Sequence, residues 1–243
     1  MVNRRDAPAD EAALQRWWDD FESTVATRDW ARAEQQLRAL ESDAAVPRGE
    51  VEYARGLVAW ERHGPHRARE FLMRSVQTDP NHADARHALA LACEELGDTL
   101  ERRRQFLAVL RLDTADDARH HLESGADRRF IIDVATEVLD SLPLQFRRRL
   151  ANVPVVLESR PSIRAVEVGV DPRSLGLFEG LTVAEATVVS PLPTRIVLYA
   201  ANLLAAFGHD DETLEAEIET TIFHEIAHFF GLDEDGVAAL GLA

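Results

Sequence analysis

Lysine is absent from this chain of 243 residues, so all 27 basic residues are arginine. A phosphate-binding P-loop and a Schiff-base cofactor site each need a lysine, so both kinds of site are excluded. A lysine general base is excluded for the same reason. The single cysteine, Cys93, excludes an intramolecular disulfide and fits a reducing cytoplasm. Cys93 lies within an apolar helical pattern, which predicts a buried structural thiol.

Long apolar runs are missing as well. No segment approaches the roughly 20 apolar residues that a membrane-spanning helix needs. Residues 1–10 are charged, whereas a signal peptide would carry an apolar segment there. The sequence therefore predicts a cytoplasmic globular protein of bacterial type, without a membrane partner.

Positive charge is scarce, and the net charge is −16. This charge argues against nucleic acid as a partner, because phosphate binding needs a basic face. No arginine follows Arg195, whereas acids are frequent from Asp210 onward. Two interpretations stay open: a solvated acidic surface, or a field that concentrates cations such as a metal ion and a basic substrate.

The most informative motif is H-E-x-x-H at residues 224–228. Residues four apart lie on one helical face, so the imidazoles of His224 and His228 can reach one metal ion at about 2.0–2.1 Å. Glu225 lies beside the first ligand, where its carboxylate can take a proton from a metal-bound water. The pattern predicts a Zn²⁺ site with Glu225 as the catalytic base.

The sequence around this motif predicts a helix with a defined start and end. Acids at residues 210–212 suit a helix N-terminus, and Gly231 suits a left-handed turn at the C-terminus. An apolar stripe with a period of four residues runs along the helix: Leu214, Ile218, Ile222, Ile226 and Phe230. The turn can bring Asp233, Glu234 or Asp235 back toward the metal, as the third protein ligand that catalytic zinc sites typically have.

The C-terminal half resembles the small bacterial zincin-like metallopeptidases sometimes called minimal zincins. Residues 224–234 fit H-E-x-x-H-x-x-G-x-x-acid, and the segments at residues 153–161, 175–180 and 193–199 are similar to that family in the same order. The resemblance covers about residues 128–243. It implies a compact α+β domain in which a small sheet packs against the zinc helix.

The resemblance also bears on the third ligand. Related zinc sites place it ten residues after the first histidine, where this chain has Glu234. The family usually has Asp followed by Glu here, whereas this chain has Glu234 followed by Asp235, so Asp235 is the alternative ligand. Asp233 is expected to cap a short helix that begins near Gly236.

The N-terminal half shows a helical-hairpin pattern that recurs every 34–35 residues. Corresponding positions are Ala33, Ala68 and Arg102, then Leu37, Leu72 and Phe106, with Asp29, Gly64 and Asp98 at the turns. This pattern resembles three degenerate tetratricopeptide repeats over roughly residues 12–116. Such hairpins stack into a solenoid with a concave groove. The four tryptophans lie in this half, where core packing accounts for most of them and one can line a peptide groove.

The predicted fold class is therefore α+β overall, in two domains. Residues 1–118 form an all-α, tetratricopeptide-like solenoid, and residues 119–243 form the zincin-like domain, which we expect to fold alone. Within the second domain, Phe130, Val134 and Val138 predict a helix that Pro143 ends. Residues 153–158 predict an inner strand, residues 194–199 a second strand, and residues 175–180 an edge strand.

Two functions fit these features. The first is a zinc-dependent metallopeptidase that hydrolyses peptide bonds, with helical repeats that recruit a substrate or partner protein. The alternative is a repeat scaffold that binds proteins, with a structural or vestigial zinc site and no proteolysis. Glu225 favours the enzyme, because a structural site needs ligands but no base between them.

Overall fold

The structure is a computed structural model that describes residues 7–180, 194–233 and 236. The chain forms two compact units, residues 1–109 and 110–243. The sequence-based division at 118/119 lies further along the helix that runs from the first unit into the second. None of the described helices is long and apolar enough to cross a membrane.

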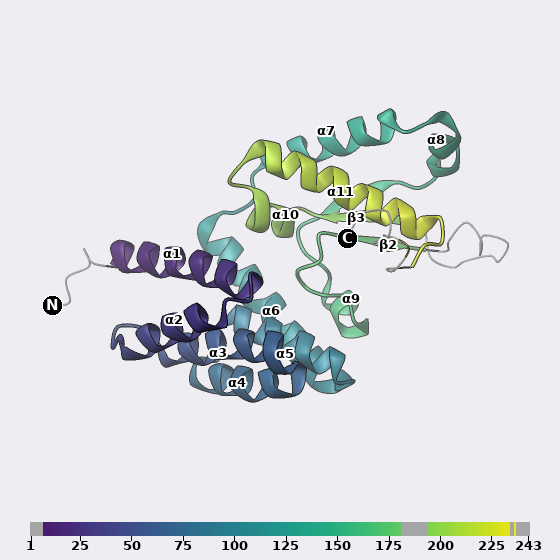
Figure 1. Ribbon diagram of the computed structural model, residues 1–243. Coiled ribbons are helices and arrows are strands. Elements are labelled where there is room, and N and C mark those ends of the chain that lie inside the picture. The colour runs from purple at the N-terminus through teal and green to yellow at the C-terminus, as the bar shows by residue number, and fades with distance from the viewer. Residues whose placement is uncertain (1–6, 181–193, 234–235, 237–243) are drawn as a thin grey trace. The chain divides into compact units, whose positions relative to one another are not determined.

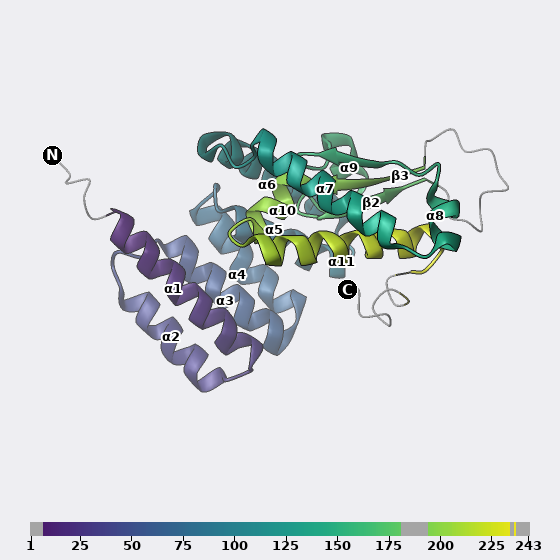
Figure 2. The same ribbon diagram turned by 90° about the horizontal axis from the view of Figure 1, so that it is seen from above.

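The first unit is built from helices alone. They are α1 (Ala7–Ala26), α2 (Trp30–Ser42), α3 (Arg48–His63), α4 (Pro65–Thr78), α5 (Ala83–Glu95) and the first half of α6 (Thr99–His120). Consecutive helices from α1 to α4 lie side by side, as Figure 2 shows.

Turns lie where the repeat pattern predicts them. The Asp29 carboxylate accepts a hydrogen bond from the backbone N–H of Arg32 at the start of α2, and Asp98 accepts one from Glu101 at the start of α6. Gly64, between α3 and α4, has φ +78°, a conformation that favours glycine. The three hairpin turns are therefore confirmed, while the tetratricopeptide assignment itself stays a prediction.

Two apolar clusters hold this unit together. The first centres on Phe21 and Leu40 and is covered by Trp17, Trp18 and Trp30. The second contains Leu72 and the fully buried Cys93, with Trp60 packed against it. Burial raises the pKa of the Cys93 thiol, so the thiol stays protonated at neutral pH. The prediction of a buried cysteine is confirmed.

The second unit combines helices with a small sheet. Its elements are the second half of α6, α7 (Gly125–Ser141), α8 (Leu144–Leu150), β1 (Val155–Glu158), α9 (Ile163–Val168), β2 (Gly176–Glu179), β3 (Arg195–Tyr199), α10 (Ala200–Phe207) and α11 (Asp211–Phe229). The predicted helix around Val134 is α7, and Pro143 lies between α7 and α8 as expected.

The three described strands have the order β1-β3-β2, with β1 parallel and β2 antiparallel to β3. Residues 153–158 were predicted as an inner strand, whereas within the described residues β1 pairs only with β3 and lies at an edge. The apolar side chains of β1 reflect packing of one face against helices rather than a central place in the sheet. β2 lies at the opposite edge of the described sheet, which agrees with the edge strand predicted at residues 175–180.

One face of the sheet packs against α7 and α11, which lie side by side in Figure 1. Ile196 and Leu198 of β3 point into this core, together with Ile131 of α7 and Ile218 of α11, and all four are almost fully buried. An α+β domain with its sheet against the motif helix is therefore present, as the sequence predicts.

Candidate metal and catalytic site

Helix α11 carries the motif and begins where the acids predict. The Asp210 carboxylate caps it by accepting hydrogen bonds from the backbone N–H and the hydroxyl of Thr213. These hydrogen bonds lower the pKa of Asp210, so the cap is ionised at neutral pH. The predicted apolar stripe faces the core, from the buried Leu214 to Ile226. His224 and His228 lie off this stripe and can turn toward the cleft described below.

The two imidazoles converge on one point. His224 Nε2 and His228 Nε2 are 3.0 Å apart. Two nitrogens bound tetrahedrally to one zinc ion at about 2.05 Å would lie about 3.3 Å apart. The two Nε2 atoms are therefore close to the spacing that a shared ion requires. A shift of one ring by a few tenths of an ångström would reach that spacing.

The end of α11 fixes the tautomer of His228. Gly231 has φ +88°, its N–H donates to the His228 carbonyl at 2.9 Å, and the Leu232 N–H donates to the Ala227 carbonyl at 3.1 Å. This is a Schellman motif. It places the Leu232 carbonyl 3.0 Å from His228 Nδ1. Because a carbonyl only accepts, Nδ1 must donate, so in the neutral ring Nε2 carries the lone pair that a metal needs.

Glu225 lies where α11 meets β2, and only 6% of the residue is exposed. Gly176 of β2 allows this approach. A Cβ atom at Gly176 would lie 3.1 Å from Glu225 Oε1 and 2.7 Å from Thr221 Cγ2. The carboxylate is therefore held against the start of the edge strand, next to the two imidazoles in sequence and in space.

A cleft of about 480 Å³ joins these groups. One side is formed by Gly176, Leu177 and Phe178 of β2, and the other by His224, Glu225 and His228 with the turn after α11. An extended peptide can add to an exposed sheet edge by main-chain hydrogen bonds. The cleft therefore offers two nitrogen ligands and one carboxylate beside a strand edge.

The predicted third ligands, Glu234 and Asp235, lie outside the described residues. Asp233 is described, and its carboxylate accepts a hydrogen bond from the Gly236 N–H at 2.9 Å, which is the capping role expected of it. No group of three or more potential metal-ligating side chains occurs within the described part of the chain. The structure thus places two of the predicted donors and the predicted base.

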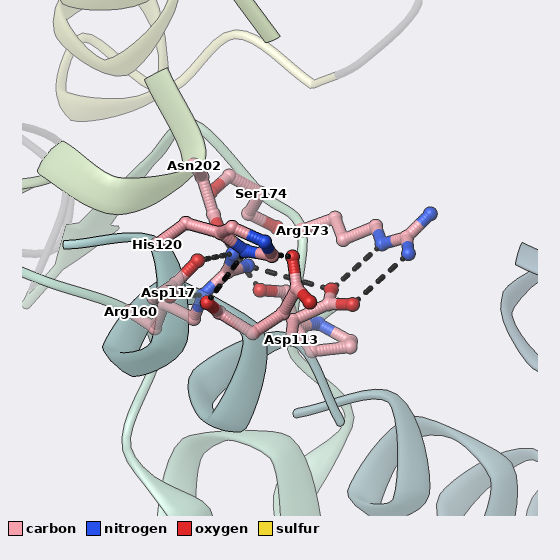
Figure 3. Close-up of polar contacts among 9 residues, drawn as sticks. Asp113, Asp117, His120, Arg160, Arg173, Ser174 and Asn202 are labelled. Atoms are coloured by element: carbon pink, nitrogen blue, oxygen red, sulfur yellow. Dashed lines mark hydrogen bonds and ion pairs between the residues drawn. The ribbon is translucent and has the colours of Figure 1, made fainter. Parts of the chain in front are cut away.

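A buried ionic network holds the segment that leads into β2 (Figure 3). Arg160, after β1, donates two hydrogen bonds to Asp117 of α6, at 2.5 and 2.8 Å, and one to Asp113 at 3.4 Å. Arg173, just before β2, donates to Asp113 at 2.9 and 3.1 Å.

Asn202 of α10 completes this network. Its side-chain oxygen accepts a hydrogen bond from Arg160, and its amide nitrogen donates to the backbone carbonyls of Pro172 and Ser174 at 2.9 and 2.6 Å. Ser174 lines the cleft. The network therefore ties one wall of the cleft to α6 and α10, and the sequence analysis did not predict it, although Arg160 lies in the segment 153–161 that resembles the family.

The other face of the sheet carries a second ionic group. Arg195 of β3 donates to Glu179 of β2 at 2.6 Å and lies 3.2 Å from Glu158 of β1, so one guanidinium links all three strands. Burial raises the pKa of the Tyr199 phenol well above its usual value, and the Glu158, Glu179 and Glu225 carboxylates add to this rise. Tyr199 is therefore a neutral side chain at physiological pH.

Comparison with known families bears on this geometry. Residues 150–242 match the zincin-like metallopeptidase family. The match includes β1, β2, β3 and α11, and thus the whole described cleft, while it does not extend to the helices of the first unit. It also leaves out α7, although α7 supplies buried residues to the same core. No curated protein matches the chain.

The close approach at Gly176 gives a first prediction. Gly176→Ala is expected to lower the free energy of unfolding of the second unit by about 1–3 kcal/mol, because the methyl group must displace Thr221 and Glu225. Thermal unfolding measures the effect. Gly125→Ala is the matched control, because its Cβ would meet only Arg129 Nη1, at 3.6 Å. Equal stability of the two variants would show that α11 does not approach β2 this closely.

Proposed function

We propose that this chain is a zinc-dependent peptidase whose active site is the cleft between α11 and β2. The observation that carries the proposal is the convergence of His224 Nε2 and His228 Nε2, in the ligating tautomer for His228, beside the buried carboxylate of Glu225. The match to the zincin-like metallopeptidase family supports the same reaction class.

Each residue has a defined role in this proposal. His224 and His228 bind the metal through Nε2, and Glu234 is the third ligand, with Asp235 as the alternative. When bound, zinc supplies a Lewis acid that polarises the scissile carbonyl and acidifies water. Glu225 accepts the proton of the attacking water on its carboxylate and then passes it to the leaving amine. The Leu232 carbonyl orients the His228 ring by accepting from Nδ1.

The substrate is proposed to be a peptide or protein segment in extended conformation, paired with the edge of β2. Its backbone would then lie along Leu177 and Phe178, with the scissile bond opposite Glu225. The helical repeats of the first unit are proposed to recruit a substrate or partner protein. Neither nucleic acid nor a membrane is among the proposed partners.

A peptide-library digest tests the proposal. Full-length protein loaded with zinc is incubated with the library, and mass spectrometry identifies new termini, with a chelator-treated sample as the control. Zinc-dependent cleavage at a reproducible set of bonds is the expected result. Bound zinc without any cleavage would instead favour the alternative, a protein-binding scaffold with a structural zinc site.

The third ligand gives a second prediction. Glu234→Ala is expected to weaken zinc affinity at least about tenfold, because a carboxylate that binds the metal directly is lost. Asp233→Ala is the matched control, because its carboxylate accepts a capping hydrogen bond from Gly236 and should contribute little to affinity. Competition with a chromophoric chelator measures the affinities. If Asp235→Ala releases the metal and Glu234→Ala retains it, Asp235 is the ligand.

A further inference from the structure

The first unit contains a groove of about 550 Å³ lined by α1, α3 and α5, the first helices of the three hairpins. Its apolar lining consists of Val25 and Ala26 from α1, Leu57 and Trp60 from α3, and Ala88 and Leu91 from α5. Leu57, Trp60 and Leu91 are only partly buried, so part of their apolar surface faces the groove. An apolar concave site of this size can enclose one or two large side chains.

The charges around the groove are mainly negative. Glu22 and Glu61 line it together with one cation, Arg28. Asp19 of α1 and Asp84 of α5 lie close enough to Glu22 to raise the pKa of its carboxyl, after the larger effect of burial. Three acids from two different helices thus share one negative field at the Glu22 end of the groove. A cation placed there would relieve their mutual repulsion.

Within the described side chains, no ion pair is seen for Glu22 or Glu61, whereas several acids elsewhere in the same unit form one. Glu34 pairs with Arg62, Glu41 with Arg55, and Glu70 with Arg67. An incoming cationic side chain can therefore pair with Glu22 or Glu61 without breaking an ion pair among the described side chains.

We propose that this groove binds a segment of a partner protein that presents a large apolar side chain next to a lysine or arginine. The apolar side chain contacts Leu57, Trp60 and Leu91, and the basic side chain lies beside Glu22. This inference deepens the proposed recruitment by the repeats and rests on it, but it does not depend on hydrolysis. It names the chemistry by which the repeats would select a substrate or partner.

Two panels of short fluorescent peptides test the inference. One panel carries a central Leu, Phe or Trp flanked by arginine, and the matched panel carries glutamate in place of arginine. Fluorescence anisotropy with full-length Glu225→Gln protein measures binding without turnover. We expect the arginine panel to bind at least about tenfold more tightly than the glutamate panel. We also expect its binding to weaken as the salt concentration rises.

Variants of the groove locate the binding. Glu22→Arg is expected to weaken binding of the arginine panel about tenfold. Leu57→Gln is expected to weaken binding of both panels by a similar factor. Leu57 is partly exposed, and circular dichroism verifies that both variants fold. Glu70→Gln on α4 is the matched control, because it removes one negative charge outside the groove and should leave binding unchanged.

The outcomes separate this inference from the proposed peptidase. Equal binding of both panels, or wild-type binding by Glu22→Arg and Leu57→Gln, would overturn it even if the wild-type protein cleaves peptides. Groove-dependent binding by a protein that cleaves no peptide would support the inference about the groove and contradict only the proposed peptidase activity.

Discussion

Replacing Glu225 with glutamine is expected to reduce peptide hydrolysis by about 10²–10⁴-fold, the contribution usual for a positioned general base. Zinc content should stay at the wild-type value, because Glu225 is not among the proposed ligands. Glutamine has nearly the same shape, so it can occupy the same buried place against Gly176. Its amide cannot accept the proton of the attacking water, which isolates the chemical role from the packing role.

Initial rates on a peptide identified in the digest measure the effect, and elemental analysis measures zinc. Glu219→Gln is the matched control, because Glu219 is an exposed acid on the same helix. Hydrolysis by Glu225→Gln at the wild-type rate would show that another group is the base. A loss of zinc in the same variant would show that Glu225 contributes to metal binding.

A fragment that begins at residue 119 is expected to be less stable than one that begins at residue 110 by about 3 kcal/mol, because several hydrogen bonds between charged side chains are lost. The shorter fragment lacks Asp113 and Asp117, the two carboxylates that pair with Arg160. In the intact chain only 9% of the Arg160 side chain is exposed, and without these carboxylates Asn202 is its remaining partner in the network. Arg173 would lose its hydrogen bonds to Asp113 as well.

Chemical denaturation of the two fragments measures the difference, and both are examined with zinc present. In the full-length chain, Arg160→Gln should destabilise the second unit, whereas Arg164→Gln, at an exposed position, should have little effect. Equal stability of the two fragments would show that the second unit does not need the end of α6.

Local signals explain what the sequence could predict. The start of α11 depends on a cap at Asp210, and its end depends on the left-handed conformation at Gly231, so both are encoded within a few residues. The hairpin turns of the first unit are local in the same way. His224 and His228 converge because residues four apart share a helical face.

Contacts between distant segments explain what the sequence could not predict. The partners of Arg160 lie 42 to 47 residues away, and nothing near Arg160 in the sequence identifies Asp113, Asp117 or Asn202. The place of β1 at the edge of the described sheet depends on its pairing with β3, which its own apolar pattern does not specify. The Leu232 carbonyl was missed because its role appears only once the chain has turned at Gly231.

Zinc analysis of the purified full-length protein is the most direct test of this account. We expect about one zinc per chain in the wild type, and loss of that zinc together with a lower thermal midpoint in His224→Ala and His228→Ala. Leu232 contacts His228 Nδ1 through its backbone carbonyl, which every residue has. Substitution of the Leu232 side chain should therefore leave the zinc in place. A wild-type protein that holds no zinc and takes up none on titration would contradict the account.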